Sequence, residues 1–327
     1  MPMTTASRAA WSRMRMRQSP HLRDLIAETT FTAGHLIQPL FVVEGLGASE
    51  PIRGLGDNAR HGIAAAADTA KRDIDAGVRH FLLFPIPATK HMYGSSAQGA
   101  RAAEAVKRAV GDAAHVWVDV CLCAATPTGH CALFGDGGGI DLDATLSALG
   151  ASAVAMADAG ADGVSPSDMM DGRTAYIRAA LDAAGHGRVP IMSYSTKFAS
   201  QMYGPFREAA SSAPQFGDRR QYQIDVRSRT DAIASSVRCA HEGADLLMVK
   251  PGMTSIDLIA PIREATGAPV GAYQVSGEFA GLTLLAERGL TDFDAALIET
   301  WHVFRRAGAS YVITYGARHG RRLGLAG

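Results

Sequence analysis

Lysine, cysteine and long apolar runs are scarce in this chain of 327 residues, and it carries no net charge. Its 32 Lys and Arg balance 32 Asp and Glu, so no general field attracts nucleic acid or an acidic membrane. No apolar run approaches the roughly 20 residues that cross a bilayer, and no apolar core or small-residue cleavage site follows the Arg-rich N-terminus. We therefore expect a cytosolic, cytoplasmic protein with no nucleic-acid partner and no membrane partner.

Only five of the 32 basic residues are lysines: Lys71, Lys90, Lys107, Lys197 and Lys250. Codon bias toward Arg is a sufficient cause. Even so, a chain that uses Arg almost everywhere needs a reason for each Lys in an apolar context, and Lys197 and Lys250 are so placed.

Four cysteines are too few for a disulfide framework, but three of them lie close together at Cys121, Cys123 and Cys131. This spacing is typical of a metal site in a reducing compartment. Three thiolates can hold Zn²⁺ and leave a fourth position for water or substrate. His130 as a fourth, closing ligand and three unliganded thiols are the alternatives.

Strand and helix alternate along the chain. Short β-rich runs predict strands at Gln38–Val43, Arg79–Phe84, His115–Val120, Gly163–Ser165, Val189–Ser193, Asp245–Val249, Pro269–Val275 and Ser310–Thr314. Ala-rich segments of helical period predict helices at Gly62–Asp75, Gln98–Val110, Ala144–Ala159, Arg173–Ala184, Thr230–Glu242, Ile256–Ala265, Glu278–Glu287 and Asp292–Arg306. Eight such units favour an α/β fold of the (β/α)8 barrel type, a TIM barrel, over a doubly wound sheet.

A glycine follows four of these helices just before a strand, at Gly77, Gly160, Gly243 and Gly308. Such a glycine supplies the left-handed residue that turns the chain back to the sheet. We expect a barrel over residues 36–327, preceded by an N-terminal arm over residues 1–35. The arm is either disordered or packs on another subunit, and its arginines, which lack an aromatic platform for nucleic acid, are Arg8, Arg13, Arg15, Arg17 and Arg23.

Barrel enzymes build their active sites at the C-terminal ends of the strands. The polar residues expected there come from six strands: Asp119, Cys121, Ser167, Asp168, Lys197, Lys250, Ser276 and Tyr315. Lys250 ends an apolar strand, and burial lowers the pKa of an amine, which produces the nucleophile of Schiff-base chemistry. Lys197 has a similar setting one strand earlier, so two cations would depress each other's pKa. A buried lysine paired to a carboxylate is the alternative for either one.

A long Gly- and Arg-containing stretch, from Tyr203 to Gln223, follows Lys197. Loops of this length commonly act as lids, and Arg207 and Arg219 can clamp a carboxylate. An ordinary solvated loop is the alternative.

Five segments together resemble the porphobilinogen synthase family, also called 5-aminolevulinate dehydratase. The match runs from about Leu36 to Tyr315, and its most specific pieces are Asp119–Cys123, Pro166–Arg173, Tyr203–Arg207, Met248–Gly252 and Tyr273–Glu278. The resemblance implies a hydro-lyase of haem and tetrapyrrole synthesis, which condenses two 5-aminolevulinate molecules to porphobilinogen with loss of two waters.

The resemblance also implies roles for individual residues. Lys250 would form a Schiff base with the propionate-side substrate, whose carboxylate meets Ser276 and Tyr315. Lys197 would bind the acetate-side substrate, whose carboxylate meets Arg207 and Arg219. Gln223 would lie near that carboxylate, and zinc on the three cysteines would hold and polarise the same substrate. The remaining residues implied to line the pocket are Asp119, Ser167, Asp168, Tyr203, Phe206 and Tyr273. The family is typically a homo-octamer whose arms wrap neighbouring barrels.

Several positions differ from the usual family pattern. They are Ser96 for Glu, Ala125 for Tyr, Thr128 for His, Ala132 for Gly, Val226 for Pro, and Asp231, where magnesium-responsive members carry Glu. Because the Asp231 side chain is one methylene shorter than Glu, the sequence does not decide whether this chain binds the allosteric Mg²⁺ of those members. A Schiff-base aldolase-type barrel, which needs one lysine and no thiolate zinc, and a non-catalytic paralogue are the competing hypotheses.

Overall fold

The computed structural model describes residues 14–91 and 97–326, so Arg8, Arg13 and Ser96 lie outside the described residues. It divides into two units, Met1–Thr30 and Phe31–Gly327. In the first unit, η1 (Met14–Arg17) precedes α2 (Pro20–Leu25). Helix α2 begins at Ser19, whose hydroxyl accepts the N–H of Leu22 at 3.1 Å, as an N-cap does.

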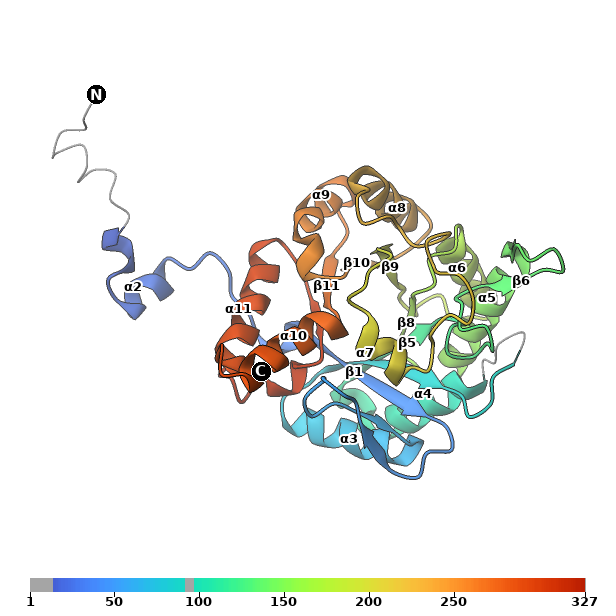
Figure 1. The fold of residues 1–327 in the computed structure, drawn as a ribbon, viewed down its shortest axis with the longest axis horizontal. Helices are drawn as coiled ribbons and strands as arrows, with labels where there is room; N and C mark the ends of the chain where they lie inside the picture. Colours follow the sequence, from blue (N-terminus) through green and yellow to red (C-terminus); the bar gives the residue numbers. More distant parts are fainter. Residues whose placement is uncertain (1–13, 92–96, 327) are drawn as a thin grey trace. The chain divides into compact units, whose positions relative to one another are not determined.

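Eight parallel strands of the second unit form a ring (Figure 1). They are β1 (Leu36–Val43), β4 (His80–Ile86), β5 (His115–Val120), β8 (Gly163–Pro166), β9 (Met192–Lys197), β10 (Leu246–Lys250), β11 (Val270–Gln274) and β12 (Val312–Thr314). Neighbouring strands follow the order β8-β5-β4-β1-β12-β11-β10-β9. A backbone bridge from Val164 to Ile191, and a 2.7 Å bond from the Ser165 hydroxyl to the Met192 carbonyl, join the two ends. The predicted barrel is confirmed and the doubly wound alternative is wrong.

Helices surround this ring (Figure 1). They are α3 (Ile63–Asp75), α4 (Ala97–Val110), α5 (Leu142–Asp158), α6 (Arg173–Ala183), α8 (Arg229–His241), α9 (Ile256–Thr266), α10 (Ser276–Glu287) and α11 (Phe293–Arg306). Asp141 and Asp292 cap α5 and α11 by accepting backbone N–H groups of the first turn. The four junction glycines all have positive φ, from 90° to 102°, which is the conformation that the sequence predicted for them.

Strand β9 lies further along the chain than expected, at Met192–Lys197 rather than Val189–Ser193. The residues Ser193 to Thr196 all carry hydroxyl groups, yet they are fully buried. Two of their hydroxyls are satisfied inside the barrel: Thr196 donates to the Ala232 carbonyl at 2.8 Å, and Ser195 to the Met248 carbonyl at 3.3 Å. Internal hydrogen bonds therefore allow a polar strand to be buried.

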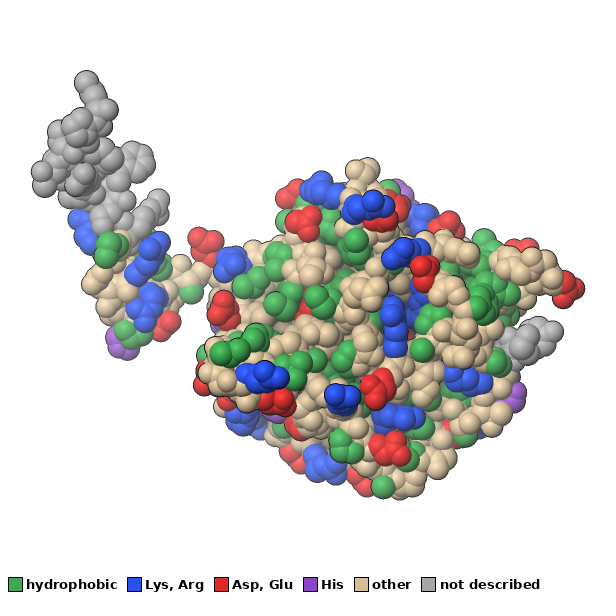
Figure 2. All heavy atoms as spheres, in the orientation of Figure 1, with side chains coloured by type: hydrophobic (Ala, Val, Ile, Leu, Met, Phe, Trp, Pro, Cys, Tyr) green, Lys and Arg blue, Asp and Glu red, His purple; other side chains and the backbone are tan. Residues whose placement is uncertain are grey.

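Short elements that the sequence did not predict lie in the connections. They are η2 (Ala33–His35), β2 (Ser49–Pro51), β3 (Ala59–His61), η3 (Gly111–Ala113), β6 (Leu133–Phe134), β7 (Ile140–Asp141), α7 (Gly204–Ala209), η4 (Met253–Ser255) and η5 (Ala317–His319). On the face shown in Figure 2, acidic and basic side chains of the barrel are interspersed, in keeping with the zero formal charge. Among the described residues, no helix combines the length and the apolar character needed to cross a bilayer.

Candidate active site

Lys197 and Lys250 end two neighbouring strands of the barrel. Lys197 is the last residue of β9 and Lys250 the last of β10, and the parallel ladder pairs them with each other. Both nitrogen atoms lie near one ring. The Lys197 Nζ is 5.5 Å and the Lys250 Nζ 4.7 Å from the ring centroid of Tyr194. The two amines therefore lie on the same side of the barrel wall, at its C-terminal mouth.

Aromatic rings surround the amine of Lys250. Its Nζ lies 4.1 Å from the ring centroid of Tyr273, 4.9 Å from that of Phe206 and 5.4 Å from that of Tyr203, in addition to the Tyr194 ring. Burial, followed by repulsion from Lys197, holds the pKa of Lys250 well below its usual value. Ring faces also attract cations, so a positive charge that forms there during reaction is stabilised. This environment favours a free, nucleophilic amine.

Lys197 is 5% exposed and reaches across to the loop after β8, where its Nζ donates to the carbonyl of Ser167. Asp119, near the end of β5, has its Oδ1 buried without a partner in the described residues. Burial raises the pKa of Asp119 to about 6, although the charge of Lys197 opposes the shift. A carboxyl group that titrates near neutrality beside two amines can hold or release a proton.

Asp168, like Ser167, follows β8, but its side chain is turned toward Arg173. Its Oδ1 accepts the N–H of Met170 at 2.8 Å, and its Oδ2 lies 3.7 Å from the Arg173 Nε. Both side chains are fully buried, and burial raises the pKa of Asp168 to about 6 against the pull of Arg173. Arg173 also donates to the Tyr194 carbonyl at 3.1 Å. Arg173 thus supports β9 at Tyr194, whose ring lies near both lysines. Arg173 belongs to the motif Pro166–Arg173, but no role was predicted for it.

The three cysteines of the loop after β5 converge. The Sγ atoms of Cys121, Cys123 and Cys131 all lie within 4.8 Å of one another, and Cys123 and Cys131 are buried. His130 does not join them, because its ring nitrogens meet the Tyr222 hydroxyl and the Phe216 carbonyl, each at 2.9 Å. The closed four-ligand alternative is therefore wrong. Three clustered soft donors fit a thiophilic metal ion and leave one position of a tetrahedron open.

The stretch from Tyr203 to Gln223, here called the lid, contacts the cysteine loop through buried residues, while other parts of it, such as Phe216, are exposed. Arg219 is 5% exposed and donates to the carbonyls of Gly129, at 2.8 Å, and Ser212. Polar atoms near it lack partners among the described residues, namely the Nε atoms of Arg207 and Arg219 and both amide atoms of Gln223. Buried polar atoms without partners indicate a place for a polar ligand.

Tyr315 and Ser276 lie at the ends of β12 and β11. The Tyr315 hydroxyl is 3.2 Å from that of Tyr273, beside the ring cage of Lys250. The Ser276 hydroxyl accepts the N–H of Phe206 at 3.0 Å, so it also anchors α7 at the start of the lid. Tyr203, the N-cap residue of α7, donates its hydroxyl to the Lys250 carbonyl at 3.1 Å.

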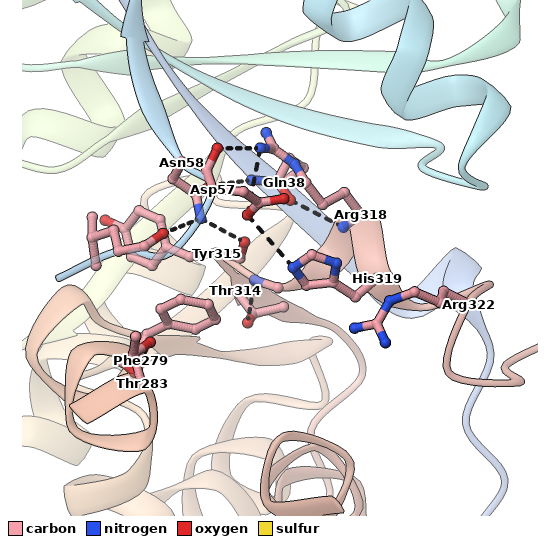
Figure 3. A network of polar contacts seen from close by, with 12 residues as sticks. Gln38, Asp57, Asn58, Phe279, Thr283, Thr314, Tyr315, Arg318, His319 and Arg322 are labelled. Carbon is pink, nitrogen blue, oxygen red and sulfur yellow. Dashed lines mark hydrogen bonds and ion pairs between the residues drawn. The ribbon is translucent and has the colours of Figure 1, made fainter. Parts of the chain in front are cut away.

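A buried amide pair supports Tyr315 from behind (Figure 3). Asn58 donates to the Tyr315 carbonyl at 3.0 Å and accepts from Gln38 at 3.0 Å. Gln38 in turn accepts the N–H of Arg318 at 3.1 Å, and Arg318 is paired with Asp73. This hydrogen-bonded network fixes the end of β12 and with it the place of the phenol.

A small cavity of about 30 Å³ touches Asp119, Cys121, Cys123 and Phe206. We therefore expect the lid or the ring cage to move when an organic substrate binds.

Comparison with known proteins gives one consistent result. The family model of delta-aminolevulinic acid dehydratase matches residues 11–323. The delta-aminolevulinic acid dehydratase of Synechococcus elongatus is 43% identical over 94% of this chain and 97% of its own length. The protein of the same name from Escherichia coli is 41% identical over 93% of this chain and 94% of its own.

A solved structure agrees with these sequences. The delta-aminolevulinic acid dehydratase (porphobilinogen synthase) of Toxoplasma gondii, in complex with its reaction product porphobilinogen, superposes with a TM-score of 0.91. It is 35% identical and covers 98% of this chain and 92% of its own. Since the family model spans most of the chain, and relatives above 40% identity span nearly all of it, the resemblance read from the motifs is confirmed and the chain belongs to the delta-aminolevulinic acid dehydratase family.

Proposed function

We propose that this lyase, a porphobilinogen synthase, joins its two 5-aminolevulinate molecules through Schiff bases on Lys250 and Lys197. The observation that carries the proposal is the in-register pairing of the two buried amines beside the Tyr194 ring. Each amine attacks the ketone of one substrate and releases one water. Formation of a carbon–carbon and a carbon–nitrogen bond between the substrates then frees both lysines, so the product is two substrates less two waters.

The chain's own residues supply the rest of the chemistry. The ring cage excludes water from the Lys250 imine and stabilises its iminium charge. Asp119, near the two amines, holds or releases the proton that imine formation and breakdown require. The pocket on the Lys250 side is lined by Tyr203, Phe206 and Tyr273, and on the Lys197 side by Ser167 and Asp168.

Two sets of residues hold the substrate carboxylates in this proposal. Ser276 and Tyr315 lie beside the Lys250 cage and receive the carboxylate of the first substrate. Arg207 and Arg219, with Gln223, receive that of the second, and their unpartnered polar atoms support this assignment.

The metal of this site is Zn²⁺ in our proposal, held by Cys121, Cys123 and Cys131. The clustering of the three sulfur atoms supports this choice. When bound, zinc supplies a Lewis acid that polarises oxygen atoms of the second substrate.

The proposal extends to assembly in the cytoplasm as a homo-octamer whose N-terminal arm, residues 1–35, packs on a neighbouring copy. In the described part of this segment Met14 and Leu25 are 68% and 80% exposed, and exposed apolar side chains indicate a surface that another protein covers. Light scattering on the full chain tests the subunit number, and a monomer would contradict it.

Borohydride reduction in the presence of 5-aminolevulinate tests the central step. The reduced adduct should appear at Lys250 in the intact chain and disappear in Lys250→Met. Lys71→Met, which removes an exposed lysine from α3, is the matched control and should keep the adduct. An adduct confined to lysines other than Lys250 and Lys197, or none in the intact chain, would contradict the proposed chemistry.

A further inference from the structure

Three consecutive residues of the cysteine loop contact the lid. The Thr128 carbonyl accepts the N–H of Gln215 at 2.9 Å, and the Gly129 carbonyl accepts from Arg219 at 2.8 Å. The next residue, His130, meets the lid at both ring nitrogens. The metal-site loop and the lid are therefore joined directly, and the joined residues immediately precede Cys131.

The backbones approach so closely that only glycine fits at the middle position. Gly129 has φ +68°, and a Cβ atom placed on it would lie 2.2 Å from the Ala213 carbonyl oxygen. A closed lid thus depends on this loop having its present shape.

His130 is 2% exposed and packs between rings of both segments. Its ring centroid lies 4.6 Å from that of Phe216, in the lid, and 5.1 Å from that of Phe134 in β6. The imidazole therefore fills the interface between the lid and the loop, where water is excluded.

The hydrogen bonds define the tautomer of the neutral ring. The Phe216 carbonyl can only accept, so Nε2 carries the hydrogen and donates it. Nδ1 is then an acceptor, and the Tyr222 hydroxyl donates to it. The Tyr222 oxygen keeps a lone pair for the backbone N–H of Cys131 at 3.3 Å. Every donor in this series of hydrogen bonds has an acceptor. The series runs from the Cys131 N–H to Tyr222, then to His130 and finally to the Phe216 carbonyl.

We propose that His130 is a positioning residue that latches the closed lid onto the cysteine loop, through Phe216 and Tyr222, and so holds Arg219 at the second substrate's carboxylate. The inference rests on the proposed function, because it assigns a step to capture of the second substrate. Because the cavity beside the cysteine loop is small, we expect the latch to open during turnover. His130 thus governs the closed state of the lid and takes no part in bond making.

The test separates hydrogen bonding from packing. His130→Phe keeps an aromatic ring in the interface and loses both hydrogen bonds. His130→Gln retains an amide that can donate toward Phe216. His186→Phe removes a histidine that bonds Asp158 at 2.7 Å away from the lid, and serves as the matched control.

Two measurements report the latch. Trypsin cleavage after Arg219, which is 5% exposed and bonded to the cysteine loop, reports lid opening, and steady-state kinetics separate KM from kcat. We expect His130→Phe to raise both the cleavage rate and the KM for 5-aminolevulinate by roughly three- to tenfold. His130→Gln should restore part of both effects, and His186→Phe should leave them unchanged. In a double-mutant cycle with Tyr222→Phe, the second substitution should add little to the first.

Other results would overturn the latch. Wild-type cleavage and KM in His130→Phe, a change confined to kcat, or full additivity with Tyr222→Phe would each do so. Borohydride trapping at Lys250 should persist in every variant, since His130 contacts Phe216 and Tyr222 and not Tyr203 or Phe206, the lid residues beside Lys250. Loss of trapping from His130→Phe alone would show that His130 shapes the whole site rather than latching the lid, whereas absence of trapping in the unsubstituted chain would count against the proposed function instead.

Discussion

The carboxylate of Glu278 accepts the backbone N–H of Met253, three residues beyond Lys250, at 2.8 Å. Its other oxygen accepts the N–H of Val275 at the start of α10, also at 2.8 Å. One buried carboxylate therefore joins the segment that follows Lys250 at the end of β10 to Val275, the residue before Ser276 at the start of α10. Glu278 ends the motif Tyr273–Glu278, but no role was predicted for it from the sequence.

Glu278 should make stability depend on pH. Burial raises its pKa to about 7, above the ordinary value of 4.5, so the folded state binds the proton more tightly than the unfolded state. The folded state therefore loses stability through this group as pH rises from about 4.5 to 7. Replacing Glu278 by Gln removes that loss, and the stability of Glu278→Gln relative to wild type should increase across the window by on the order of 3 kcal/mol. Unfolding of both proteins at one concentration, at pH 5 and pH 7.5, checks this. Parallel pH profiles would contradict it.

Lys197 should lower the pKa of the neighbouring Lys250. Repulsion from Lys197 contributes to the lowered pKa of Lys250, so Lys197→Met should raise that pKa. The pH dependence of borohydride trapping at Lys250 should then shift to higher pH, because fewer amines are free at a given pH. Lys107→Met, which removes a lysine paired with Asp162, is the control and should leave the profile in place. An unshifted profile in Lys197→Met would show that burial alone sets the pKa.

Cys123 should be required to hold the metal. Cys123→Ala leaves two thiolates, and metal affinity should fall by more than about tenfold. Cys239→Ala removes a buried cysteine outside the cluster and should retain the metal. Elemental analysis of the purified proteins, before and after dialysis against chelator, gives the comparison. Equal metal content in both variants would mean that the cluster is not the site.

Arg219 should serve the second substrate more than the first. Arg219→Met removes a charge-assisted partner of a carboxylate, which costs roughly 1.5–3 kcal/mol. Product formation should therefore weaken while trapping of the first substrate on Lys250 persists. Arg220→Met changes the adjacent, exposed arginine and should alter neither. Equal losses in trapping and product formation for Arg219→Met would contradict the assigned sides.

Periodicity and turn residues predicted the barrel because they act locally. Apolar runs and junction glycines such as Gly160 and Gly243 placed each helix with ends that differ by two residues or fewer from those observed. Strand β9 was misplaced because its burial depends on hydrogen bonds to α8 and β10, which are distant in sequence. Local propensity carries no information about such partners.

The site was predictable as a set of residues and less so as an arrangement. Strand-end logic and motifs identified Lys197, Lys250 and the cysteines. They did not show that Asp168 turns to Arg173, that His130 faces the lid, or that the Tyr194 ring lies near both amines. These features depend on side-chain directions that are set by packing in three dimensions. In the sequence, only the presence of Arg173 in a motif pointed to any of them.

The ring of strands is joined least firmly where β8 meets β9, by one backbone bridge, one serine hydroxyl and the contact between Lys197 and Ser167. Lys197 lies beside this join, whereas Lys250 ends β10, which has β9 on one side and β11 on the other. A small shift of β9 against β8 would thus move the Lys197 amine more than the Lys250 amine. We therefore expect the position of the Lys197 amine to be the more adjustable of the two.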